Sequence, residues 1–146
     1  MPLTPKGHLA LIDDEFAAAL QAPLSARQAM LVAMLIDHYP DRLFKAERSD
    51  IVRVLGAEDL PAYRTLLREQ YPALAAAMAV CVGEARLVIK TVEVQLENYA
   101  QLSIEDFMVS LYNGHTVQRV MLERAGAPDR LAREVLAGAI EVCRRL

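Results

Sequence analysis

The stretch from residue 73 to residue 101 constrains the fold most, because it contains a single glycine and no proline. Glycine and proline are the residues that most often interrupt a helix, so this stretch predicts one long helix. Apolar residues recur along it at alternating spacings of three and four, at positions Ala75, Met78, Val82, Ala85, Ile89, Val92, Leu96 and Tyr99. This spacing is the a/d pattern of a heptad repeat. We expect the helix to be the central strut of the domain or part of a subunit interface.

A second apolar stripe lies on the far side of the same predicted helix. It consists of Val80, Leu87 and Val94, which are seven residues apart. Leaving each of these side chains in water would forgo about 1.5–3 kcal/mol of burial free energy. We therefore expect both sides of the helix to be covered and these three residues to form an interface. Gly83 is expected to permit the close approach of a neighbouring helix.

The remainder of the chain predicts further helices and no convincing β-strand. Capping residues, glycines and prolines bound each predicted helix. The predicted segments are 5–22; 26–36, with an interruption at 38–41 and a further turn at 43–44; 50–55, closed by Gly56; 59–70; 73–101; 103–112; 116–125; and a last helix between Pro128 and Leu146. This organisation predicts a single all-α domain over residues 1–146, a bundle of about six to eight helices around the long helix at 73–101.

Composition and charge exclude several classes of protein. The chain has 146 residues, 54% of them hydrophobic, which suits one packed domain and excludes a disordered chain. Its net charge is −3, and Glu58 and Asp59 would repel phosphate at the only helix-turn-helix-like segment, 49–70, so we expect no nucleic-acid partner. The longest apolar runs, 30–36 and 73–82, fall below the roughly 20 residues that span a bilayer. We expect no membrane partner and a cytoplasmic location.

No recognised metal, nucleotide or catalytic motif is present, so we expect no cofactor and no metal site. The three histidines, His8, His38 and His115, are widely separated along the chain. The two cysteines, Cys81 and Cys143, lie in apolar surroundings, and we expect them to be structural thiols. A disulfide between them, or a reactive thiol, stays open as an alternative.

Three groups of polar residues are candidates for a ligand site. Glu93 and Glu97 are four residues apart and share one face of the predicted helix, the geometry in which two carboxylates can share a proton or a cation. The other two groups flank predicted helix ends and comprise Asp37, His38 and Tyr39, and Tyr112 with His115. Each group also has a structural interpretation, as a solvated strip beside Lys90 or as polar residues that complete a helix end.

Two functional hypotheses follow from these patterns. In the first, the protein is a non-enzymatic module that self-associates, a dimer being favoured, or docks a helical partner through the long helix centred near Ala85. In the second, it is a small-molecule-binding protein or an enzyme whose pocket opens between helices near His38, Tyr112 and His115. The sequence does not decide whether the protein is an enzyme.

Overall fold

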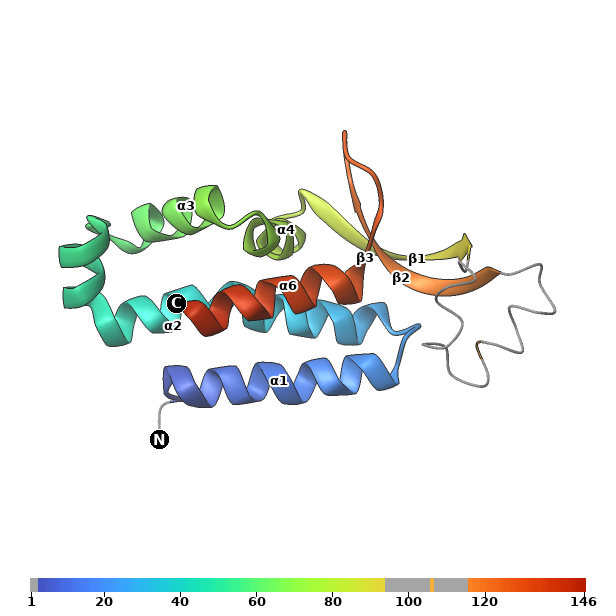
Figure 1. Ribbon diagram of the computed structural model, residues 1–146, viewed down its shortest axis with the longest axis horizontal. Helices are drawn as coiled ribbons and strands as arrows, with labels where there is room; N and C mark the ends of the chain where they lie inside the picture. The colour runs from blue at the N-terminus through green and yellow to red at the C-terminus, as the bar shows by residue number, and fades with distance from the viewer. Residues whose placement is uncertain (1–2, 94–105, 107–115) are drawn as a thin grey trace.

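A computed structural model describes residues 3–93, 106 and 116–146. A helical body and a small sheet make up this part of the chain, and the paired strands project from one end of the body (Figure 1). The elements are α1 (Pro5–Gln21), α2 (Ala26–Leu55), α3 (Leu60–Gln70), α4 (Pro72–Cys81), β1 (Ala85–Glu93), β2 (Thr116–Arg124), β3 (Arg130–Leu131) and α6 (Ala132–Arg145).

The predicted all-α bundle is wrong, because the described residues include a three-stranded antiparallel sheet in the order β1-β2-β3. The long helix predicted at 73–101 does not form. Its first part is α4, the chain then turns at Gly83, and residues 85–93 form strand β1. The helix predicted at 116–125 is strand β2. Residues 94–101 and the helix predicted at 103–112, apart from residue 106, lie outside the described residues.

Local chemistry explains why the apolar stretch divides at Gly83. This residue has a φ of 80°, a left-handed conformation that glycine adopts without a steric penalty and that ends a helix. Beyond it, β-branched residues dominate, and these favour an extended backbone: Val88, Ile89, Thr91 and Val92. Apolar residues on two sides of a segment do not distinguish a helix from a strand, because either element can be covered on both sides. The heptad spacing therefore indicated the wrong element.

The helix starts predicted at residues 5, 26 and 59 are confirmed, whereas the segment predicted as a separate helix at 50–55 is the last part of α2. The Thr4 side chain accepts a hydrogen bond from the Gly7 N–H at the start of α1, and the Ser25 hydroxyl accepts one from the Gln28 N–H, both at 3.0 Å. Asp59 caps α3 in the same way. Gly56 ends α2 with a φ of 72°, as the sequence indicated.

The interruption predicted at 38–41 is absent, because α2 continues through Pro40 and departs from helical geometry only at Glu47. A proline inside a helix costs about 3 kcal/mol through its missing N–H and its ring. Here Ile36, Tyr39 and Leu43 are all buried, so the apolar face of α2 runs unbroken past the proline. Burial of that face offsets the local cost.

The core lies between the helices and extends under the hairpin of β1 and β2. Helix α6 contacts α1, α2 and α4, and strand β1 contacts α2 and α4. In the antiparallel register Leu87 faces Leu122 and Ile89 faces Val120. Leu122 and Val120 are buried in the same cluster as the helix residues, and Leu87 packs against it. The sheet is thus joined to the helical body by one apolar face.

Substituting Gly83 tests the helix end directly. Gly83→Ala should destabilise the protein by about 1 kcal/mol, because alanine is strained in the left-handed conformation. Within a continuous helix the same change would stabilise the protein by about 1 kcal/mol. The free energy of unfolding in urea distinguishes the two. Gly83→Asn is the matched control: asparagine tolerates the left-handed conformation, so its loss should be smaller than that of alanine.

Candidate functional site

The structure separates the predicted site residues Asp37, His38 and Tyr39. The Asp37 carboxylate binds Arg64 of α3 at 2.6 Å, which ties α3 to α2. The His38 side chain is 75% exposed and lies 3.7 Å from Asp41. Tyr39 is buried, with its ring edge-on to the His8 ring. Consecutive helical residues point about 100° apart, so these three side chains share no pocket.

The remaining predicted residues are divided between the fold and the undescribed segments. Glu93 is exposed at the end of β1, Val80 is buried at the end of α4, and Leu87 is half-buried against the core. Glu97, Val94, Tyr112 and His115 lie outside the described residues.

Both cysteines are free thiols, as the sequence indicated. Burial raises the pKa of Cys81 to about 11 and that of Cys143 to about 12. A thiol with so high a pKa is almost entirely protonated at neutral pH and is a poor nucleophile.

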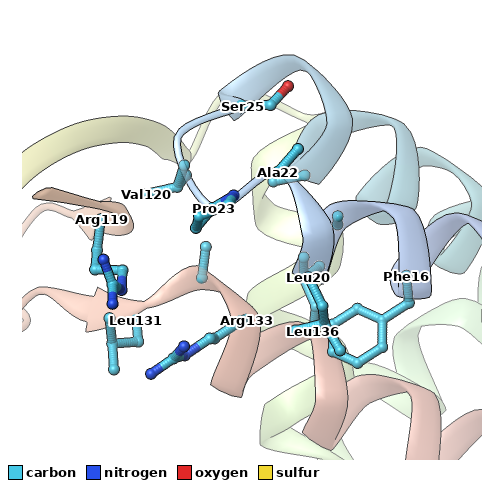
Figure 2. A pocket seen from close by; sticks show the side chains of 13 residues that line it. Phe16, Leu20, Ala22, Pro23, Ser25, Arg119, Val120, Leu131, Arg133 and Leu136 are labelled. Atoms are coloured by element: carbon cyan, nitrogen blue, oxygen red, sulfur yellow. The ribbon is translucent and has the colours of Figure 1, made fainter. Parts of the chain in front are cut away.

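A different set of residues forms a small pocket at the junction between the helical body and the sheet (Figure 2). The cavity has a volume of about 40 Å³. Its walls come from the end of α1, the turn into α2, strand β2, and the start of α6. The lining residues are Phe16, Ala19, Leu20, Ala22, Pro23, Ser25, Ala29, Arg119, Val120, Leu131, Ala132, Arg133 and Leu136. We call this cavity the Arg119 pocket.

Arg119 is the unusual member of the pocket, because an arginine is only 5% exposed there. One terminal nitrogen donates to Asp106 Oδ2 and the other to the Gln118 carbonyl, each at 2.8 Å. Burial of a guanidinium is costly unless its charge is paired, and Asp106 supplies the opposite charge. A guanidinium carries five N–H donors. Two of these donors are used in the bonds to Asp106 and to the Gln118 carbonyl.

Arg133 supplies a second guanidinium at the same pocket. It lies in the first turn of α6, is exposed, and forms no ion pair with any described residue. Figure 2 shows Arg119 and Arg133 on one side of the pocket, with Phe16, Leu20 and Leu136 on the other. The pocket therefore combines a cationic side with an apolar side.

The neighbouring charges on the sheet are neutralised within the hairpin. Lys90 lies opposite Arg119 in the strand register. Its ammonium nitrogen is 2.6 Å from Glu123 Oε2 and 2.6 Å from Asp129 Oδ2. The hydrogen bond from Lys90, together with one from Arg86, lowers the pKa of Glu123 to about 2. Glu123 therefore stays ionised at neutral pH and neutralises the cations of the hairpin.

Sequence reasoning missed this site because its residues come from segments that are distant along the chain. Arg119 was assigned to the helix predicted at 116–125 and was not singled out there. A buried arginine carries no local sequence signal, since its burial depends on how β2 pairs with β1 and β3. Ser25 directly precedes the helix predicted at 26–36, and its hydroxyl does cap α2.

No group of three or more His, Cys, Asp or Glu side chains among the described residues could hold a metal ion. In the same residues, no helix is long and apolar enough to cross a membrane. No family model matches the chain, and no curated protein or solved structure matches it. The chemistry of the Arg119 pocket is therefore the main guide to function.

Proposed function

We propose that the protein binds a small organic anion in the Arg119 pocket. The observation that carries this proposal is the pairing of two guanidiniums with an apolar cavity. Arginine binds carboxylates through parallel N–H donors, and these charge-assisted bonds are about twice as strong as neutral ones. A carboxylate would bind between Arg119 and Arg133, and its apolar part would lie against Phe16 and Leu20.

The size of the cavity limits the ligand. A cavity of about 150 Å³ binds benzene, whereas one water molecule takes up about 30 Å³. The Arg119 pocket, at about 40 Å³, accommodates a group of one or two carbons. The methyl group of acetate and the ethyl group of propionate fit this description, with the carboxylate at the arginine side. So does the end of a longer carboxylate whose remaining part extends into solvent.

The lining favours binding over catalysis. Among the described residues that line the pocket, none is a histidine, cysteine or carboxylate. Ser25 contributes a hydroxyl, but no lining residue can act as its general base, which a serine nucleophile requires. The pocket thus has groups that hold an anion and no group that transfers a proton.

Calorimetric titration with propionate tests the proposal. Wild type should bind propionate and should not bind propylamine, a cation of similar size. Arg133→Gln should weaken propionate binding about tenfold, since a hydrogen bond to a charged group contributes about 1.5 kcal/mol. Arg130→Gln is the matched control: it removes the same charge from an exposed residue close by that does not line the pocket.

A steric variant separates the pocket from a general effect of charge. Ala19→Leu places extra carbons in the cavity and should abolish binding of propionate while leaving Arg119 and Arg133 in place. The proposal fails if wild type binds no carboxylate. It also fails if Arg130→Gln and Arg133→Gln weaken binding equally, because the anion would then be held by overall charge.

We also propose self-association, through a surface that differs from the one expected from the sequence. An open groove of about 560 Å³ lies along the first turns of α2 and is lined by Ser25, Arg27, Gln28, Met30, Leu31 and Met34. Leu31 is 39% exposed and Met34 is 51% exposed. A second copy suits this groove, because a twofold contact sets the apolar residues of one copy against those of the other.

Sedimentation velocity at micromolar concentration tests this second proposal. Wild type should sediment as a dimer and Leu31→Glu as a monomer, because the glutamate would place a charge in the apolar contact. Val54→Glu is the control, since Val54 is 71% exposed but lies at the far end of α2. A monomeric wild type, or equal effects of the two variants, would contradict self-association through the α2 groove.

A further inference from the structure

His8 is the most deeply buried ionisable side chain of α1, and it joins α1 to α2. It is 2% exposed. Its Nε2 is 2.7 Å from the Leu35 carbonyl oxygen, and its Nδ1 is 2.8 Å from Arg42 Nε. Arg42 also donates from Nη1 to the Leu3 carbonyl at 2.6 Å. We call this set of bonds the His8–Arg42 contact.

The partners of the ring determine its protonation state. A guanidinium can only donate, so the Arg42 Nε–H requires an unprotonated Nδ1 as its acceptor. The Leu35 carbonyl can only accept, so Nε2 must carry the proton. His8 is therefore neutral in the folded protein, as the Nε2–H tautomer. A second proton on Nδ1 would place two N–H groups and two positive charges against each other in a buried site.

The charged groups around His8 oppose its protonation. From α2 these are Arg42 and His38, with the neutral Tyr39 ring in edge-on contact. On α1, Lys6 is exposed. From α6, Arg144 reaches α1 further along, where it binds Asp13. No carboxylate of the described residues forms an ion pair with the His8 ring, so nothing there compensates for a charge on it.

Helix α1 connects this contact to the Arg119 pocket. His8 lies in its first half, and Phe16, Ala19 and Leu20 in its second half form one wall of the pocket. The second half is held to α2 by Gln28, which donates to the Glu15 carbonyl and carboxylate.

We propose that the His8–Arg42 contact is an acid-sensitive closure: protonation of His8 detaches α1 from α2, opens the wall of the Arg119 pocket and releases the bound anion. Only the last step, release of the bound anion, rests on the proposed function. Detachment of α1 is a property of the fold and is measured separately.

The direction of the pH dependence follows from the pKa of His8. Burial lowers this pKa from its usual 6.5, the Leu35 bond opposes that change, and the charges of Arg42 and His38 lower it further. The unfolded or detached state thus binds a proton more readily than the closed state. The closed state has its full stability above pH 6.5. This stability decreases as the pH falls from 6.5 to the pKa of His8 in the folded protein.

Hydrogen exchange at pH 7.5 and pH 5.5, corrected for intrinsic exchange rates, tests the closure. In wild type, the protection of α1 amides should fall by up to about tenfold at pH 5.5, because this pH lies one unit below the usual histidine pKa of 6.5. Amides of α4 should change less, because the hydrogen bonds and the ring contact of the His8 side chain join it to α2. His8→Asn and His8→Gln cannot titrate and should show no acid-dependent loss. His38→Gln removes an exposed histidine but leaves the bonds of His8 in place, so it should keep the acid-dependent loss, shifted to slightly higher pH because the charge of His38 no longer opposes protonation of His8.

Propionate titration of the same proteins at both pH values separates the two proposals. Protonation of propionate itself affects all variants equally, so an additional loss of affinity in wild type, absent from His8→Asn or His8→Gln, supports release by His8. Equal exchange of α1 in wild type and both variants overturns the closure. A normal loss of α1 protection without propionate binding at either pH supports detachment of α1 and overturns the proposed function alone.

Discussion

The end of α4 at Gly83 is the constraint on which the rest of the structure depends. The apolar composition of residues 73–93 favours burial in either secondary structure, and the left-handed glycine stops the helix at the point where β-branched residues begin. Strand β1 then leads away from the helical body and pairs with β2 in an antiparallel register. Only this pairing positions Arg119 beside the start of α6 and the turn between α1 and α2. The Arg119 pocket therefore depends on the end of α4 at Gly83.

Local features of the fold could be predicted from the sequence, and long-range ones could not. Thr4, Ser25 and Asp59 cap helices through bonds to residues three positions away, so their signals are contained in short segments. Strands 85–93 and 116–124 stabilise each other across a long separation, and neither is marked by clear alternation of polar and apolar residues. Pro40 shows the opposite case. Its strong local signal predicts a break in the helix, but burial of the neighbouring apolar residues keeps the helix continuous.

The candidate site was even less accessible to sequence reasoning. His8 follows a helix start and resembles a surface residue until α2 folds over it. The burial of Arg119 is explained only by the pairing of the strands and by its ion pair with Asp106. The two buried groups illustrate different solutions to one electrostatic problem: Arg119 keeps its charge because a carboxylate accompanies it, whereas His8 stays neutral because its neighbour is a cation. The proposed anion site includes the first arrangement, and the proposed response to acid depends on the second.

Backbone NMR of the isotope-labelled protein tests this fold most directly. The Cα and Cβ chemical shifts should be helical from residue 72 to 81 and extended from 85 to 93, and Ile89 should show cross-strand nuclear Overhauser contacts with Val120. Helical shifts that continue unbroken from residue 73 to residue 93, without those contacts, would contradict the hairpin and with it the Arg119 pocket.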